Sequence, residues 1–251
     1  MMKIGLVGFG KTGKAVASVL LQHSSFSLEW VLRKRKLQEK MTAPEILGIE
    51  STDPGQLFSG SCITTEDLLE QHPVDAIIDF SDTSGIYSYA KAAADRGIKI
   101  ISAISHYADK EKNYLKKLSE TTAVFWSPNI TLGVNYLIYA ARQLKKIAPW
   151  VDIQIVEEHF KGKAGVSGTA VKIAEALSLE DEEINSVRAG GIVGRHEVIF
   201  GFPFQTVRLI HESISREAFG NGVVFVAENM QHKKKGLFNF DDILLPYLQT
   251  R

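Results

Sequence analysis

The segment from Glu157 to Ala170 gathers an imidazole, two ammonium groups and a carboxylate in one short run. An imidazole titrates near pH 6.5, so His159 can give a proton to a reacting atom at neutral pH. Lys161 and Lys163 can share in that transfer or offset the charge of a bound anion. Taken alone, His159 is equally well explained as a surface histidine, and the glutamates as ion-pair partners of nearby lysines.

The same segment ends in residues that favour the start of a helix, and a helix start can bind an anion. Ser167 is a good N-cap, and Gly168 and Thr169 then present backbone N–H groups that have no helical partner. A Ser-Gly-Thr run by itself is a common helix start. Beside His159, it predicts a site that holds an anionic substrate next to a proton donor.

A glycine-rich turn near the N-terminus predicts where a dinucleotide binds. The turn follows the apolar run Lys3–Val7 and opens the helical pattern Gly13–Gln22. One glycine permits the tight turn, one lets the backbone approach a pyrophosphate, and one lets the helix pack closely on the strand. The alternative is a glycine turn without a ligand. The residues expected at the cofactor are Gly8, Phe9, Gly10, Lys11, Thr12 and Gly13.

The end of the second predicted strand, Phe26–Leu32, bears on the choice of cofactor. NAD is usually bound by an acidic residue at this position, whereas this chain has Arg33, flanked by Lys34 and Arg35. A guanidinium suits a 2′-phosphate through paired, charge-assisted hydrogen bonds. We therefore expect NADPH to be preferred, with NADH as the alternative. The alternative is a basic loop that only faces solvent.

Three more segments follow predicted strands and are expected to share one edge of a sheet. Open α/β sheets bind ligands at the carboxyl ends of their strands, so these segments are expected to contact the cofactor. Singly, each is ordinary turn chemistry. The cofactor-binding residues predicted in this way are Phe80, Ala103, Ile104, Ser105, Ser127, Pro128 and Asn129.

Apolar runs and helical patterns alternate through the first half, which predicts a parallel, doubly wound sheet. A loop-rich region extends from Arg33 to about Cys62, and Thr65 is expected to cap a short helix. The remaining strands are predicted at Ala76–Phe80, Ile98–Ile101 and Ala123–Trp126, and the remaining helices at Ser84–Arg96 and Ala108–Leu118.

The second half has a different pattern. Val187–Ile210 alternates with period 2 and has turn signals at Gly190-Gly191 and Gly201-Phe202-Pro203, which predicts a mixed or antiparallel sheet. A strand is also expected at Asp152–Glu157, and helices at Leu132–Ile147, Gly168–Leu177 and Phe219–Met230.

The fold class is thus α/β, with an N-terminal Rossmann-type doubly wound parallel sheet and a C-terminal α+β domain. We expect residues 1–129 to bind the dinucleotide, with the tail 239–251 returning to them, and residues 130–238 to bind substrate and form oligomers.

Composition narrows the functional classes. The 251 residues carry 29 basic and 29 acidic side chains, which argues against general binding to nucleic acid or acidic membranes. Cys62 is the only cysteine, and neither a signal peptide nor a membrane-spanning run is recognisable. No closely spaced His, Cys and Asp residues suggest a metal site. A cytoplasmic protein is expected, and His196 and His211, on predicted strands, are interpreted as structural.

With the glycine loop, Asp79-Phe80-Ser81, Ser127-Pro128-Asn129 and Ser167–Ala170 in this order, the chain resembles the 4-hydroxy-tetrahydrodipicolinate reductases, also called dihydrodipicolinate reductases. The resemblance spans nearly the whole chain. It implies a two-domain reductase of lysine and diaminopimelate biosynthesis that uses NADPH or NADH to reduce a cyclic dicarboxylate imine with loss of water. It also implies a homotetramer assembled through the sheet of the second domain.

The resemblance also assigns roles to residues. His159 and Lys163 correspond to the proton-donating pair, and Gly168 and Thr169, next to Ser167, correspond to residues that bind a substrate carboxylate. Phe160 stands where the family commonly has a second substrate-contacting histidine.

Several positions depart from the family pattern. One residue is missing between Lys163 and Ser167, and Ala164-Gly165-Val166 replaces the usual Asp and Pro. Ala103-Ile104-Ser105-His106 replaces a Gly-Thr-Thr-Gly, and the glycine loop is one residue shorter than its commonest form. These departures leave open which lysine faces the site. They also leave two alternatives: an oxidoreductase that acts on another small carboxylate, and a cofactor-binding regulatory protein without catalysis.

Overall fold

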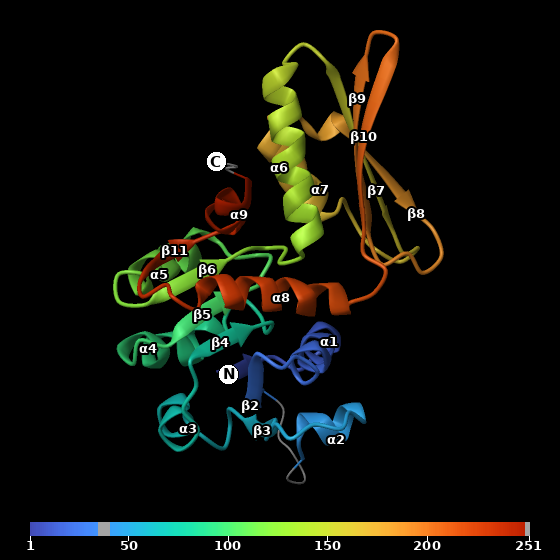
Figure 1. The fold of residues 1–251 in the computed structure, drawn as a ribbon. Coiled ribbons are helices and arrows are strands. Elements are labelled where there is room, and N and C mark those ends of the chain that lie inside the picture. The colour runs from blue at the N-terminus through green and yellow to red at the C-terminus, as the bar shows by residue number, and fades with distance from the viewer. Residues whose placement is uncertain (35–40, 249–251) are drawn as a thin grey trace. The chain divides into compact units, whose positions relative to one another are not determined.

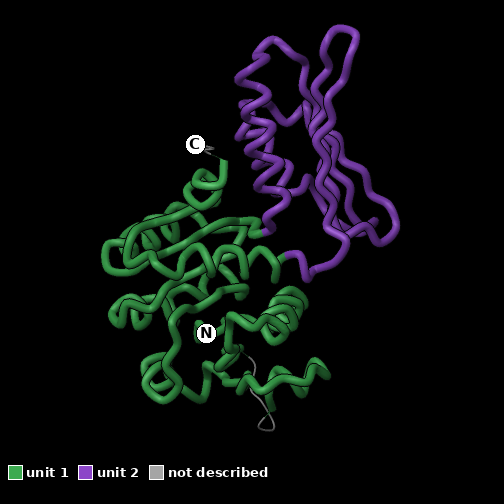
Figure 2. The backbone as a smooth tube through the Cα atoms, in the orientation of Figure 1, with its two compact units in different colours: residues 1–130, 219–251 green, residues 131–218 purple. Residues whose placement is uncertain are grey.

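The computed structural model describes residues 1–34 and 41–248, and the chain divides into two compact units (Figures 1 and 2). The first unit consists of Met1–Ile130 together with Phe219–Arg251, and the second is Thr131–Ala218. No helix in the described ranges is both long and apolar enough to cross a membrane.

A seven-stranded parallel sheet organises the first unit, in the order β11-β6-β5-β4-β1-β2-β3. All four residues of the central strand β4 are buried, as expected where helices cover both faces of a parallel sheet. The predicted Rossmann-type sheet is therefore confirmed. Its strands are β1 (Met2–Val7), β2 (Phe26–Arg33), β3 (Gln56–Ser59), β4 (Ala76–Asp79), β5 (Lys99–Ser102), β6 (Ala123–Trp126) and β11 (Gly236–Phe238).

The helices of the first unit match the helical patterns of the sequence closely, except in the region before Cys62. There the expected loop contains α2, which begins with a capping box formed by Thr42 and Glu45, and also the edge strand β3. The N-cap of α3 is Thr64, whose side chain accepts a hydrogen bond from Asp67, rather than Thr65. The helices are α1 (Lys11–Leu20), α2 (Ala43–Leu47), α3 (Thr65–Gln71), α4 (Ile86–Asp95), α5 (Asp109–Leu118), α8 (Glu217–Met230) and α9 (Phe240–Leu248).

The C-terminal segment belongs to the first unit over more of its length than the sequence pattern indicates. Strand β11 pairs with β6, and the ring of Phe240 packs edge-on against Phe125 with centroids 5.3 Å apart. Helix α8 also packs here, since a Cβ at Gly220 would lie 2.6 Å from Val19 on α1. The helical pattern at Phe219–Met230 does not show which unit the helix packs against, and β11 has only three residues. Residues 219–238 were therefore expected in the second domain.

The second unit is a four-stranded mixed sheet in the order β10-β9-β7-β8, with α6 and α7 on one face (Figure 1). Strands β7 and β8 are parallel, whereas β9 pairs antiparallel with both β7 and β10, so the predicted mixed sheet is confirmed. The turn between β9 and β10 lies at Pro203-Phe204, beyond Gly201, which is still in the strand. The elements are α6 (Leu132–Ile147), β7 (Asp152–His159), α7 (Gly168–Leu177), a 3-10 turn (Asp181–Glu183), β8 (Ile184–Arg188), β9 (Arg195–Phe202) and β10 (Gln205–Glu212).

Candidate active site

A buried carboxylate and an imidazole stand together at the end of β7. Side chains two residues apart on a strand point to the same face, so Glu157 and His159 are neighbours on the face that packs against α6 and α7. His159 Nδ1 lies 2.5 Å from Glu157 Oε2, and both residues are buried. Glu157 accepts from Nδ1–H, which leaves Nε2 as the second nitrogen of the ring.

Glu157 receives hydrogen bonds from three further residues. The guanidinium of Arg188 donates to both oxygens, at 2.5 Å and 3.0 Å, and the hydroxyl of Ser186 donates at 2.6 Å. The backbone N–H of Ser167 donates at 3.3 Å. Burial acts to raise the pKa of Glu157, but the hydrogen bonds and charges of its partners lower it to about 2. The carboxylate is therefore ionised at neutral pH.

Burial and neighbouring charges act on the pKa of His159 in opposite directions. Burial lowers its pKa, the Glu157 carboxylate raises it, and the positive charges of Lys163 and Arg188 lower it again. The net direction is downward, so the free protein holds this imidazole neutral at pH 7. Nearby space is kept clear by Gly194, because a Cβ there would lie 3.0 Å from Nε2.

The loop after β7 brings Lys163, rather than Lys161, to His159. Arg188 Nε donates to the carbonyl of Lys163 at 3.1 Å, and its terminal nitrogen donates to the carbonyl of Gly165 at 2.6 Å. Lys163 is half-buried and its charge acts on His159, whereas Lys161 is exposed. The same arginine therefore fixes both the loop and the carboxylate.

Helix α7 begins where this network ends. Ser167 is its N-cap and accepts a hydrogen bond from the N–H of Thr169 at 3.3 Å. Gly168 is exposed and Thr169 half-buried, while Phe160 lies on the surface with 43% of its area exposed. The structure thus brings the predicted proton donors and the predicted helix start together through Glu157.

The sequence reasoning missed most of this network. The alternative that paired the two glutamates with nearby lysines is not what the structure has: Glu157 pairs with Arg188 and His159, and Glu158 pairs with Arg195. The register of β7 and β8 places Ser186 opposite Glu157 and Arg188 opposite His159. That pairing joins segments about 30 residues apart, so the only local signal was the alternation of Glu157 and His159.

The glycine loop has the geometry of a nucleotide-binding turn. Gly8 has φ +96°, and a Cβ there would lie 2.6 Å from the carbonyl of Phe80. A Cβ at Gly13 would collide with the carbonyl of Gly8, so α1 and β1 approach each other closely. Gly10, the N-cap of α1, has open space around it and no side-chain cap. The helix start can therefore receive a phosphate.

The ends of five neighbouring strands form one continuous edge beside this loop. Backbone hydrogen bonds run from Gly8 to Leu32, from Phe80 to Val7, from Ala103 to Asp79 and from Ser127 to Ser102, at 2.8–3.1 Å. The edge therefore brings together the predicted segments around Phe80, Ala103 and Ser127.

Individual residues of this edge differ in exposure. Ile104 points into the core, whereas Ser105 is exposed, and Pro128 and Asn129 are half-buried. The hydroxyl of Ser127 donates to the carbonyl of Asn129 at 2.6 Å, which holds the turn after β6.

The basic end of β2 is only partly described. Arg33 is half-buried and has no ion pair among residues 1–34 and 41–248. Lys34 donates to Asp82 at 2.6 Å and to Ser84 at 3.3 Å. Arg35 and Lys36 lie outside the described residues. Phe9 and Thr12 are half-buried, Lys11 is exposed, and Lys14 lies 5.6 Å from the Phe9 ring centroid.

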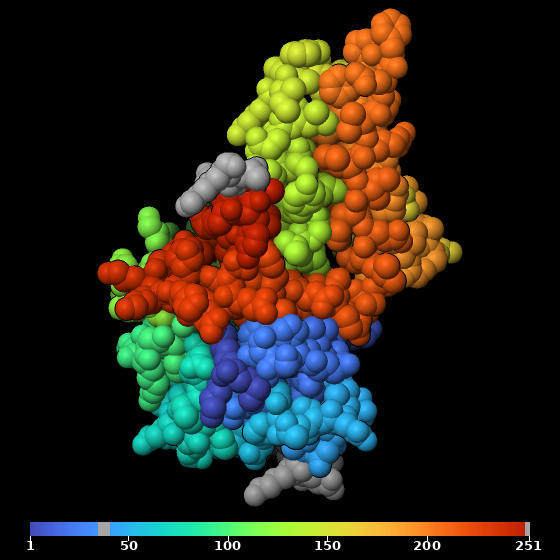
Figure 3. All heavy atoms as spheres, in the orientation of Figure 1, coloured from blue at the N-terminus to red at the C-terminus, as the bar shows by residue number. Residues whose placement is uncertain are grey.

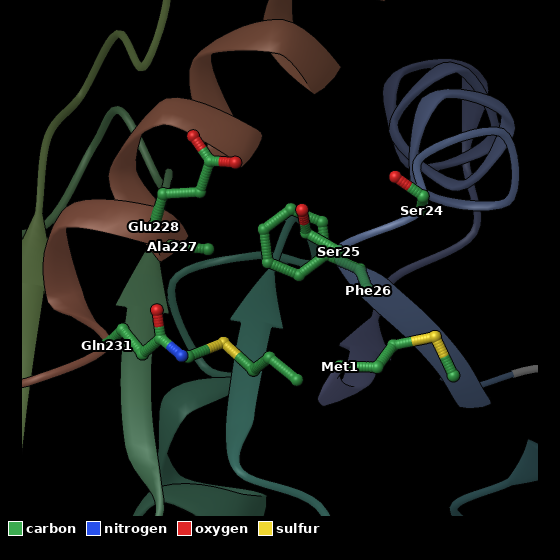
Figure 4. A pocket seen from close by; sticks show the side chains of 8 residues that line it. Met1, Ser24, Ser25, Phe26, Ala227, Glu228 and Gln231 are labelled. Atoms are coloured by element: carbon green, nitrogen blue, oxygen red, sulfur yellow. The ribbon is translucent and has the colours of Figure 1, made fainter.

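A pocket of about 260 Å³ lies at the opposite end of the first unit's strands (Figure 4). Met1, Ser25 and Phe26 at the starts of β1 and β2 line it, together with Ala227, Glu228 and Gln231 of α8. Strand β1 separates it from the glycine loop, so it is not the nucleotide site. The described residues include no group of three His, Cys, Asp or Glu side chains that could hold a metal ion.

Comparison with known proteins identifies the family. Residues 2–130 match the family model "Dihydrodipicolinate reductase, N-terminus", and residues 133–244 match "Dihydrodipicolinate reductase, C-terminus". The 4-hydroxy-tetrahydrodipicolinate reductase of Caldanaerobacter subterraneus is 33% identical over 192 residues, which cover 68% of this chain and 76% of that protein. The reductase of Polynucleobacter necessarius is 28% identical over 275 residues, covering 97% and 98%.

A solved structure supports the fold over nearly the whole length. The dipicolinate-bound dihydrodipicolinate reductase from Paenisporosarcina sp. TG-14 superposes with a TM-score of 0.78 at 20% identity, covering 95% of this chain and 97% of that one. With both family models matched and a relative above 30% identity, the chain belongs to the dihydrodipicolinate reductase family and is an NAD(P)H-dependent oxidoreductase of that type.

Proposed function

We propose that this protein reduces 4-hydroxy-tetrahydrodipicolinate to tetrahydrodipicolinate in lysine and diaminopimelate biosynthesis, with His159 and Lys163 as proton donors. The observation that carries the proposal is the Glu157–His159 pair at the start of the loop that leads to Ser167. Relatives of this chain bear the name of that enzyme, and one solved relative holds dipicolinate, a planar dicarboxylate.

The nicotinamide cofactor supplies the hydride when it is bound, so the protein need only hold the reactants and provide a proton. Gly8, Gly10 and Gly13 would hold the pyrophosphate, and the strand ends at Phe80, Ala103 and Ser127 would hold the rest. The exposed N-cap and the close approach of Gly8 to Phe80 fit such a ligand.

His159 is the proton donor because its second nitrogen remains for the substrate. Glu157 fixes the ring through Nδ1 and stabilises the imidazolium. An incoming dicarboxylate adds negative charge beside the ring, which raises the pKa of His159, so the proton is taken up together with the substrate. Lys163, the N–H of Gly168 and the hydroxyl of Thr169 would bind a carboxylate.

The proposed reaction is tested by following NADPH absorbance with enzymatically generated 4-hydroxy-tetrahydrodipicolinate. We expect turnover by the wild type and a loss of about a hundredfold in kcat/KM for Lys163→Ala, because a cation beside the proton donor is removed. Lys161→Ala, from the exposed end of the same loop, should stay within about threefold on that reasoning. Folded, cofactor-loaded wild-type protein without turnover would reject the function, and equal losses in both variants would reject the role of Lys163.

Glu157→Gln should move the pH profile of that reaction. Glu157 raises the pKa of His159, so its replacement by a neutral amide lowers that pKa. The reaction needs protonated His159, so activity falls as pH rises through this pKa, and the falling limb of kcat/KM should shift to lower pH. NADPH affinity, measured alongside, should be unchanged if the first unit binds the cofactor. If the falling limb of the kcat/KM profile stays at the wild-type pH, the result contradicts the effect of Glu157 on the pKa of His159.

We propose that NADPH is preferred over NADH through Arg33. Loss of a guanidinium that pairs with a 2′-phosphate should weaken NADPH binding by about tenfold to a hundredfold and leave NADH binding unaffected. Lys34→Ala is the matched control, because Lys34 is already paired with Asp82. Calorimetric Kd values for both cofactors decide this, and equal affinities in wild type and Arg33→Ala would reject it.

We also propose a homotetramer assembled through the sheet of the second unit. Helices α6 and α7 cover one face, whereas Val187 and Ile210, with 43% and 53% of their areas exposed, lie on the other. The edge strand β10 is visible at the surface in Figure 3. Light scattering should give four times the chain mass for the wild type and a smaller mass for Ile210→Asp, since a buried unpaired charge opposes association. A monomeric wild type would disprove the assembly.

A further inference from the structure

His196 is a buried imidazole that belongs to no role assigned so far. It lies on β9 directly opposite Glu157 in the sheet register and is 4% exposed. Its Nε2 is 3.0 Å from Ser167 Oγ, while its Nδ1 is buried and has no hydrogen-bond partner among the described residues. Its hydrogen bond to Ser167 Oγ is what distinguishes it from a histidine that only fills space in the sheet.

The imidazole of His196 is neutral. Burial lowers its pKa to about 3, and any positive charge on His159, His211 or Lys163 acts in the same direction, against the opposing Glu157. It therefore offers one donor and one acceptor nitrogen at any pH at which the enzyme works. Because the imidazole stays uncharged, its hydrogen bond to Ser167 does not change with protonation.

Ser167 is held from two neighbouring strands. Its backbone N–H donates to Glu157 on β7, and its hydroxyl lies against His196 on β9. The same hydroxyl accepts the hydrogen bond from the N–H of Thr169 that begins α7. Without His196, Ser167 would keep its backbone anchor, but its side chain would be free to rotate away from the N-cap position.

We propose that His196 is a positioning residue for substrate binding, whose hydrogen bond to Ser167 fixes the first turn of α7 so that Gly168 and Thr169 meet a carboxylate of the substrate. This inference rests on the proposed function. His196 does not touch the substrate and acts through Ser167. It also packs edge-on against the His159 ring, with centroids 5.3 Å apart, so an apolar replacement of similar size should preserve that support.

The chain offers a matched control in His211. This residue is opposite His196 in the next strand and likewise has a buried Nδ1 without a partner among the described residues. Its ring packs on Gly133 of α6, where a Cβ would lie 2.6 Å from Cδ2, and no bond links it to Ser167. His211 is thus a buried histidine of the same sheet that serves packing.

The experiment compares His196→Leu, His196→Gln and His211→Leu by steady-state kinetics and by calorimetric titration with dipicolinate. For His196→Leu we expect KM and the Kd of dipicolinate to rise at least tenfold, with kcat within threefold of the wild type. His196→Gln should recover most of this loss, because its amide can reach Ser167. His211→Leu should leave KM and Kd within threefold.

A double-mutant cycle with Ser167→Ala separates positioning from a general structural role. If His196 acts through Ser167, the double variant should bind dipicolinate within twofold of Ser167→Ala alone. Additive losses, or an unchanged KM in His196→Leu, would overturn the inference. If His196→Leu does not fold, Ser167→Ala must raise KM by itself. An unchanged KM in Ser167→Ala would also overturn the inference.

The outcomes for the wild type and for His196→Leu distinguish the proposed function from the proposed role of His196. Wild-type protein that neither turns over the substrate nor binds dipicolinate would overturn the proposed function, and the inference with it. Wild-type protein that does both, while His196→Leu behaves identically, would overturn the inference alone.

Discussion

The fully buried carboxylate of Glu157 is the constraint on which the second unit depends. An ionised carboxylate inside a protein must be surrounded by donors, and here they come from β7 itself, from β8 and from the start of α7. Three of these donors have a second role in the structure. His159 presents its other nitrogen, Arg188 holds the loop at Lys163 and Gly165, and Ser167 begins the helix. One charge thereby sets the positions of all the groups proposed to act on the substrate.

The sequence could predict the parts of this molecule whose signal is local. The glycine loop predicts a nucleotide turn because close backbone contacts require glycine at positions 8 and 13. These contacts therefore appear in the sequence as glycines at a fixed spacing. Helix α7 could be predicted from Ser167 alone. The Glu157–Arg188 pair could not, because it depends on the parallel register of β7 and β8, which no local pattern encodes. The return of α8 and β11 to the first unit is hidden for the same reason.

The two units build their candidate sites in different ways. In the first, ligand binding depends on missing side chains: Gly10 leaves the N-cap open and Gly8 brings β1 against Phe80. Backbone N–H groups suit a pyrophosphate, which is common to NADPH and NADH. In the second unit, the proposed substrate site consists of groups fixed by side chains: Arg188 bonds to the loop carbonyls, and His196 bonds to Ser167. This difference explains why the departures from the family pattern between Lys163 and Ser167 can be accommodated: Arg188 holds backbone carbonyls, which any residue in the shortened loop provides.

The charges around His159 also explain how one site can both bind an anion and donate a proton. Lys163 and Arg188 attract a dicarboxylate, but the same charges, together with burial, keep His159 neutral when the site is empty of anion. Glu157 alone would raise its pKa, and Arg188 balances much of that carboxylate's charge. Binding of a dicarboxylate reverses the balance, since it neutralises the cations that opposed protonation. On the proposed function, the acid would form when the substrate arrives, and the neutral His196 beside it adds no competing charge to that equilibrium.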